Sequence, residues 1–207
     1  MELLTPEPVR AVVFDIGGVL LHWDPGLVYR DLIPDEAERE RFLAEICTPA
    51  WNATLDAGRH LAQACAELAE RHPGQADRIW AWSRQDEMIG GEIPGTADLV
   101  ARLVEADVAT YLLTNMPAEV FAARRARYPV LQRFRGAVVS GEVGLLKPHP
   151  EIFEHLIASF GLDRAGSLFV DDLAANVAGA RAVGLGAHHF VDADHLERDL
   201  VERGFLS

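Results

Sequence analysis

A single acidic residue at the end of an apolar run is the first feature of this sequence that could carry chemistry. Asp15 follows the apolar residues 11–14 and precedes the pair Gly17 and Gly18. An apolar strand that stops at an acid and breaks into glycine places that acid at the carboxyl edge of a sheet, where open α/β sheets bind their ligands. Because Asp before glycine is also a common turn residue, Asp15 alone is compatible with a simple turn as well as with a reactive carboxylate.

Two further carboxylates, Asp171 and Asp172, end another apolar run at residues 168–170. Adjacent negative charges repel each other unless something compensates them. A divalent cation does so, and oxygen atoms are the ligands that Mg²⁺ prefers. An Asp at the N-cap of a following helix would explain one member of the pair but not both. The pair therefore indicates a metal site.

Groups suited to an anion lie between these acids in the sequence. The apolar run 109–113 ends in Thr114 and Asn115, just before a predicted helix with Pro117 in its first turn. A hydroxyl, an amide and the free N–H groups of a helix N-terminus suit a phosphate, although N-capping is the commoner use of a residue such as Asn115. Lys147, in a proline-flanked loop, would be a good point charge for a phosphate, although a lone lysine is more often solvated.

Strands that alternate with helices would bring these distant residues together, and the hydrophobic pattern predicts such an order. Strands are expected at residues 9–15, 108–114, 136–140, 167–171 and 187–191. Helices are expected at residues 96–106, 117–127, 149–160, 173–184 and from about 194. This alternation predicts an α/β fold with a doubly wound, mostly parallel sheet. Because parallel strands end at the same edge, Asp15, Thr114 and Asp171 would meet there.

Residues 22–91 have a different pattern, which predicts an all-helical cap inserted into a core made of residues 1–21 and 92–207. Helices are expected at residues 35–47, 58–72 and 75–88. No strand signal is present between residues 24 and 91, and the glycine-rich residues 90–95 predict the hinge back to the core.

Three cap residues, Trp51, Asn52 and Asp56, lie in a stretch predicted to break the helical pattern, and they could face the core. Asp56 and Trp51 are therefore candidates for a proton donor or for contacts between the cap and a substrate. As a large aromatic residue, Trp51 is expected more readily in the core of the cap.

The composition limits the partners. The chain of 207 residues has a formal net charge of −13, which disfavours nucleic acids and anionic membranes because both are bound through basic patches. An anionic small molecule would need a local positive potential from a metal, one lysine or a helix N-terminus. No run approaches the roughly 20 apolar residues that cross a bilayer, and the first residues carry no export signal. With Cys47 and Cys65 in no metal-binding pattern, we expect a cytoplasmic protein with reduced thiols, either a monomer or a homodimer.

Four short stretches, in this order, resemble the four motifs of the haloacid dehalogenase superfamily. They are FDIGGVL at 14–20, LTN at 113–115, KP at 147–148 and VDD at 170–172. They cover nearly the whole chain, and the inserted cap resembles the first cap class of that superfamily. The first stretch, with Trp23-Asp24-Pro25 close behind, is similar to the sugar-phosphatase branch that includes bacterial α-glucose-1-phosphatase, and to the phosphatase domain of soluble epoxide hydrolase.

The resemblance implies a Mg²⁺-dependent phosphatase that hydrolyses a small phosphorylated metabolite, with a sugar phosphate as one candidate. Asp15 would be the nucleophile that forms an aspartyl-phosphate. The phosphoryl oxygens would be bound by Thr114, Asn115 and Lys147. The Mg²⁺ ligands would be Asp15, the backbone carbonyl of Gly17, and Asp171 or Asp172.

Gly17 departs from the superfamily pattern. Most phosphatases of this kind carry a second Asp there, which protonates the leaving oxygen and then activates water, a contribution of about 10²–10⁴ in rate. We therefore expect slow turnover of alkyl phosphates and a preference for better leaving groups, such as anomeric sugar phosphates. His22 is the nearest titratable substitute, although a lone loop histidine is rarely catalytic without a partner.

Three alternatives stay open. A metal-independent haloacid dehalogenase uses the same nucleophile and also lacks the second Asp, but its fourth motif lacks the acidic pair. A phosphotransferase is compatible with Gly17, which cannot activate water. A non-catalytic phosphate-binding protein is the third, and the presence of Asp15, Lys147 and both late acids in one chain disfavours it.

Overall fold

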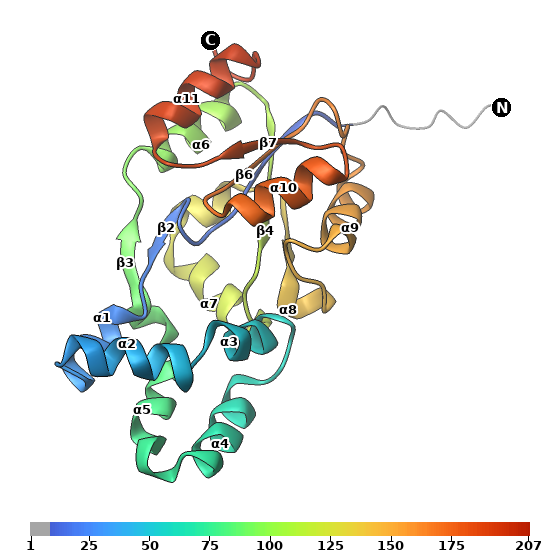
Figure 1. Ribbon diagram of the computed structural model, residues 1–207. Helices are drawn as coiled ribbons and strands as arrows, with labels where there is room; N and C mark the ends of the chain where they lie inside the picture. Colours follow the sequence, from blue (N-terminus) through green and yellow to red (C-terminus); the bar gives the residue numbers. More distant parts are fainter. Residues whose placement is uncertain (1–8) are drawn as a thin grey trace.

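A five-stranded parallel sheet forms the centre of the molecule (Figure 1), for which a computed structural model describes residues 9–207. The strands are β1 (Ala11–Phe14), β4 (Ala109–Thr114), β5 (Gly136–Val139), β6 (Leu168–Asp171) and β7 (Gly186–His189). Their order in the sheet is β5-β4-β1-β6-β7. In the central strand β1, Phe14 pairs with Leu112 of β4 on one side and with Val170 of β6 on the other. The three strands therefore end at the same edge of the sheet, within two residues of one another.

Helices cover both faces of this sheet. They are α6 (Thr96–Glu105), α7 (Ala118–Arg127), α8 (Ser140–Val143), α9 (Pro150–Phe160), α10 (Ala174–Ala182) and α11 (Ala193–Glu202), with a 3₁₀ turn at Pro129–Arg133. Alternate residues of β1 point into two separate cores. Val12 and Phe14 pack with α6, α7 and α11, whereas Ala11 and Val13 pack with α9 and α10. Burial on both faces explains why the strands are continuous apolar runs, and the predicted doubly wound α/β fold is confirmed.

The inserted segment folds around a core of its own, which takes its buried residues from Val28 to Met88. Its helices are α1 (Gly26–Leu32), α2 (Glu36–Glu45), α3 (Pro49–Asp56), α4 (Leu61–Arg71) and α5 (Ala76–Trp80). Three 3₁₀ turns follow or join them, at Pro73–Gln75, Ala81–Ser83 and Gln85–Met88. The predicted helix over 75–88 is thus one short helix and two turns. The predicted domain boundaries remain a prediction. Residues 1–8 of the predicted core lie outside the described part of the chain.

Two features of the cap correct the sequence predictions. The segment expected to lack strands contains β3 (Ile89–Glu92), which pairs antiparallel with β2 (Leu21–Trp23) to form a ribbon between cap and core. Gly91, with φ of 115°, takes a backbone conformation that L side chains rarely adopt. Because the two strands are far apart in the sequence, no local pattern marked them.

The stretch predicted to break the helical pattern is in fact helix α3 (Figure 1). Thr48 caps it by accepting a hydrogen bond from the backbone of Trp51, and Pro49 occupies its first turn. Proline is favoured at this position because its missing N–H would have no partner there. The proline therefore starts a helix where the sequence pattern predicts an interruption.

Among the helices of residues 9–207, none combines the length and apolar character that crossing a bilayer requires.

Candidate active site

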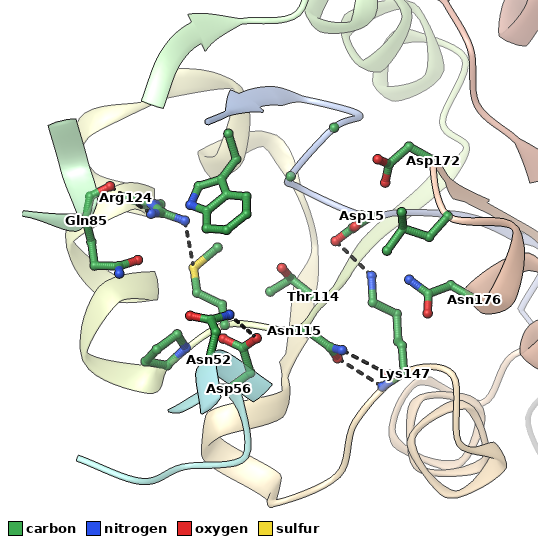
Figure 2. A pocket seen from close by; sticks show the side chains of 16 residues that line it. Asp15, Asn52, Asp56, Gln85, Thr114, Asn115, Arg124, Lys147, Asp172 and Asn176 are labelled. Carbon is green, nitrogen blue, oxygen red and sulfur yellow. Dashed lines mark hydrogen bonds and ion pairs between the residues drawn. The ribbon is translucent and has the colours of Figure 1, made fainter. Parts of the chain in front are cut away.

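Three neighbouring strands end beside one cavity of about 330 Å³, which Asp15 and Thr114 line (Figure 2) and behind which Asp171 is buried. Thr114 ends β4, Asp15 directly follows β1, and Asp171 ends β6. The N–H of Asp15 still donates to the carbonyl of Val170, at 2.9 Å, so the sheet fixes its backbone. The predicted meeting of these residues at one sheet edge is what the structure shows.

Lys147, the only lysine of the chain, lies buried in the middle of this edge rather than in solvent. Its Nζ is 2.8 Å from Oδ1 of Asp15 and 2.7 Å from Oδ2 of Asp171, and it donates to the carbonyl of Leu113 at 3.0 Å. One ammonium group therefore ties together the ends of all three strands.

Asn115 braces this lysine. Its Nδ2 donates to the Lys147 carbonyl at 2.9 Å, and its Oδ1 accepts from the Lys147 N–H at 2.9 Å (Figure 2). The N-cap of the following helix is Pro117, so Asn115 is not the simple cap that is common before a helix. Within residues 9–207, its second amide proton and its backbone N–H are left for the phosphate contact predicted for it.

The three acids form a compact cluster, in which one oxygen from each of Asp15, Asp171 and Asp172 lies within 4.8 Å of the others. Lys147 supplies one positive charge against the three negative charges of these carboxylates. The remaining negative charge can be balanced by a divalent cation. Oxygen donors at this spacing suit Mg²⁺, and the donor set therefore fits the predicted metal.

The two late acids do not have equal freedom to bind a metal. Asp171 is fully buried, and both of its oxygens already accept hydrogen bonds, from Leu173 N, Asn176 Nδ2 and Lys147. Asp172 is only partly buried and lines the cavity. A Cβ added to Gly18, whose φ is +76°, would lie 2.3 Å from Oδ2 of Asp172. Glycine at position 18 therefore lets the Asp172 carboxylate approach the Asp15 loop.

Burial and charge act in opposite directions on the central pair. Burial raises the pKa of Asp15 above its ordinary range, and the neighbouring Lys147 charge works against that rise. Burial favours neutral Lys147, but the two carboxylates Asp15 and Asp171 outweigh burial and raise its pKa. Lys147 therefore stays charged in the site.

The opposite wall of the cavity comes largely from the cap. Asn52 and Asp56 of α3, Gln85 and Trp23 line it, together with Arg124 of the core helix α7. Burial raises the pKa of Asp56 to about 7, and Arg124 and Lys147 oppose that rise. The structure thus brings Asp56, one of the predicted cap residues, to the same cavity as Asp15.

Two other predicted residues are not part of this wall. His22 alternates with Trp23 along β2 and is exposed, with its ring against Gly90. Trp51 is buried in the core of the cap, edge-on to Trp82 at 5.6 Å between ring centroids. The structure therefore brings neither residue to the cavity as a proton donor or contact.

Arg124 also lines the cavity, although no sequence motif identifies it. It is 4% exposed, and none of the described carboxylates lies within ion-pair distance of it. Its Nη2 donates to the carbonyl of Gln85 at 3.1 Å, and its Nε has no hydrogen-bond partner in the described part of the chain. The available signal was its position: it follows the buried Val120 by four residues, on the face of α7 that packs inward.

Comparison with known proteins agrees with this geometry. The family model of the haloacid dehalogenase-like hydrolases matches residues 9–184. The chain belongs to this family. As a haloacid dehalogenase-like hydrolase it has curated relatives of similar length. A sesquiterpene phosphatase of Aspergillus oryzae is 28% identical over 89% of this chain and 91% of its own. A phosphoglycolate phosphatase of Cupriavidus necator is 26% identical over 86% and 79% of the two chains.

Solved structures of the family share the fold. A HAD family enzyme of Bacteroides thetaiotaomicron, solved in complex with magnesium and inorganic phosphate, superposes with a TM-score of 0.69. The match has 22% identity and covers 91% of this chain and 98% of that one. The protein is thus an enzyme of a hydrolase family whose named relatives include phosphatases.

Proposed function

We propose that this hydrolase is a Mg²⁺-dependent phosphatase that cleaves a small phosphorylated metabolite through an aspartyl-phosphate on Asp15. The observation that carries the proposal is the cluster of Asp15, Asp171 and Asp172 within 4.8 Å, with Lys147 2.8 Å from Asp15. The phosphatases among its relatives support the same reaction class.

Asp15 is the nucleophile in this proposal. Lys147 would neutralise a phosphoryl oxygen beside it, and Thr114 and Asn115 would bind the other oxygens with a hydroxyl and N–H groups. Fixed donors of this kind are strongest where water is excluded, and Lys147 and Asp15 are both buried.

Asp15, the carbonyl of Gly17 and Asp172 would hold Mg²⁺ directly. Asp171, whose two carboxylate oxygens both accept hydrogen bonds, would orient Lys147 instead of binding the metal. The metal, when bound, would neutralise charge on the phosphoryl group. This division follows from the free carboxylate of Asp172 and the buried one of Asp171.

The substrate class is a finer part of the proposal. The cavity of about 330 Å³ is closed on one side by the cap, which suits a small molecule. Its polar lining from Asn52, Gln85 and Arg124 suits a hydroxyl-rich or anionic one. A sugar phosphate, as the first motif suggests, fits this description. Phosphoglycolate, the substrate in the name of one relative, is the second compound to test.

Release of phosphate distinguishes the proposal from a dehalogenase. A panel of phosphorylated metabolites and a 2-haloacid are incubated with and without Mg²⁺ and EDTA, and phosphate and halide are measured. We expect phosphate release that EDTA abolishes and that Asp15→Asn eliminates. Halide release that EDTA does not affect would replace the proposal with a dehalogenase.

The other two alternatives have their own outcomes in the same panel. Transfer of the phosphoryl group to an added sugar, in preference to water, would identify a phosphotransferase. Phosphate binding without turnover of any compound, and unchanged by Asp15→Asn, would identify a non-catalytic binding protein.

A further inference from the structure

This inference rests on the proposed function. Within residues 9–207, the core side of the cavity offers no carboxyl group outside the acidic cluster to move a proton in that reaction. Gly17 stands where a side chain could have moved a proton, and glycine has none. Among the described residues that line the cavity, the carboxyl groups are those of Asp15, Asp172 and Asp56. The first two belong to the acidic cluster. Asp56, from the cap, is the carboxyl that remains.

Asp56 is held in place through its side chain and its backbone. Its Oδ2 accepts a hydrogen bond of 2.9 Å from Nδ2 of Asn52 (Figure 2). The Oδ1 of Asn52 in turn accepts from Nε1 of Trp82 at 3.2 Å. Its backbone carbonyl accepts from Oγ of Ser140 at 2.6 Å, and that hydroxyl in turn accepts from the N–H of Met116. The cap residue is therefore tied to the core just beyond the ends of β4 and β5.

We propose that Asp56 is the general acid and base of this enzyme, a catalytic carboxyl supplied by the cap in place of a side chain at Gly17. The position of the residue supports this role. It lies on the cap wall of the cavity that also holds Asp15 (Figure 2). The leaving oxygen of a phosphate ester departs on the side of phosphorus opposite the nucleophile.

The two half-reactions balance with this one group. First, a carboxylate oxygen of Asp15 attacks phosphorus, the bond from phosphorus to the substrate oxygen breaks, and Asp56 gives its proton to that oxygen, so an alcohol leaves. Second, water attacks the aspartyl-phosphate, the Asp56 carboxylate takes its proton, and the bond from phosphorus to Asp15 breaks. Inorganic phosphate leaves, and the Asp15 carboxylate and the Asp56 acid are restored. Because water enters where the alcohol left, one residue can serve both steps.

The surroundings of Asp56 suit a group that must hold and release a proton near neutral pH. Burial favours its protonated form, and the positive charges that oppose burial come from Arg124 of α7 and Lys147 of the loop before α9. The balance leaves its pKa at about 7. A proton-transfer group is most effective when its pKa is close to the working pH.

Asp56→Asn tests the proposal, because it keeps the shape of the side chain and removes the proton. Two substrates are compared: glycerol phosphate, whose alcohol needs a proton to leave, and p-nitrophenyl phosphate, whose phenolate does not. We expect kcat/KM for glycerol phosphate to fall by about 10²–10⁴-fold, and that for p-nitrophenyl phosphate to fall much less. The loss of activity of the parent above about pH 7 should be absent in the variant.

A burst measurement separates catalysis from folding. With p-nitrophenyl phosphate, Asp56→Asn should release about one nitrophenolate per enzyme quickly and then turn over slowly, because no base activates water in the second step. Asp31→Asn, on the exposed surface of α1, serves as the matched control and should behave like the parent. If Asp56→Asn does not fold, Asn52→Ala, which removes the hydrogen bond to Asp56, should show the same leaving-group dependence in weaker form.

These experiments test the role of Asp56 separately from the proposed phosphatase activity. If Asp56→Asn lost activity equally on both substrates with no burst, or kept the pH profile of the parent, the role of Asp56 would be overturned. The proposed phosphatase function would still hold if Asp15→Asn were inactive. An active Asp15→Asn would overturn both.

Discussion

The two walls of the cavity are built in different ways. On the core wall, Asp15 and Asp171 lie at the ends of two paired strands, and Lys147, from the loop before α9, is joined to both by ion pairs of 2.7–2.8 Å. On the cap wall, Asp56 sits at the end of an eight-residue helix and has one side-chain hydrogen bond, to Asn52. The core wall is thus a cluster of paired charges, whereas the cap wall carries a buried acid whose ionised form no described cation pairs with directly.

This contrast suggests a division of labour. Binding and attack on the phosphoryl group need fixed charges that do not reorganise, and the sheet edge supplies them. Proton transfer to a variable leaving group needs a carboxyl whose pKa is near neutral. Burial at the cap wall raises the pKa of Asp56 into that range.

Lys147→Met should have the largest effect on both stability and activity. It leaves Asp15 and Asp171 buried without their cation, so we expect the free energy of unfolding to fall by about 3–5 kcal/mol and kcat by about 10²–10³-fold. Denaturant unfolding and steady-state kinetics measure the two effects. Arg135→Met, which removes an exposed ion pair with Asp107, is the control and should change stability by less than about 1 kcal/mol. Similar stabilities for the two variants would contradict the buried charge cluster.

The two late acids should respond differently to amide substitution. Asp172→Asn should raise the Mg²⁺ concentration needed for half-maximal activity by about tenfold or more, because a direct ligand loses its charge. Asp171→Asn should instead lower the free energy of unfolding by about 1–3 kcal/mol, because the new amide group faces donors at Leu173 and Asn176. Mg²⁺ titration and denaturant unfolding of both variants measure this. The opposite assignment would follow if Asp171→Asn had the larger effect on Mg²⁺.

Asp56 should reduce the stability of the folded protein as the pH rises. Its pKa is raised from 3.8 to about 7 on folding, so between these values the native state holds a proton that the unfolded chain has lost. Stability then falls with increasing pH across this window. Asp56→Asn removes the effect, and the variant should be more stable than the parent at pH 7 but not at pH 4. Parallel stability curves for the two proteins would show that Asp56 is not held as an acid.

Arg124→Gln should give the smallest effect, a shift in a pH profile. The Arg124 charge lowers the pKa of Asp56, so its loss should raise that pKa and move the alkaline decline of kcat/KM to higher pH. Profiles of parent and variant on one substrate measure the shift. A decline that moved to lower pH would contradict the assignment of that limb to Asp56.

The strand-end residues of the core wall could be predicted from the sequence because each of them directly follows an apolar run. Once the alternation of strands and helices indicates a parallel sheet, the strand ends must share an edge, so Asp15, Thr114 and Asp171 come together by topology alone. The braces could not be predicted in this way. Asn115 bonds the backbone of Lys147, a residue 32 positions away, and no local pattern records such a contact.

The cap wall was harder to predict for a physical reason. Its helices are short, and their boundaries depend on capping rather than on a long hydrophobic repeat. The sequence predicts a break in the helical pattern around Trp51 and Asp56, whereas Thr48 and Pro49 start helix α3 there. The β2–β3 ribbon joins segments on either side of the whole insertion. Which of the cap residues would face the core therefore depended on tertiary packing, and His22 and Asp56 could be ranked only in the structure.

The covalent step at Asp15 is the centre of this account, and an acid quench measures it directly. The parent enzyme is mixed with Mg²⁺ and its best phosphorylated substrate, quenched in acid during turnover, and analysed by peptide mass spectrometry. We predict one added phosphoryl group on the peptide that contains Asp15, absent when EDTA is present and absent in Asp15→Asn. Full phosphate turnover by the Asp15→Asn variant, or a phosphoryl group found on another residue instead, would contradict the account.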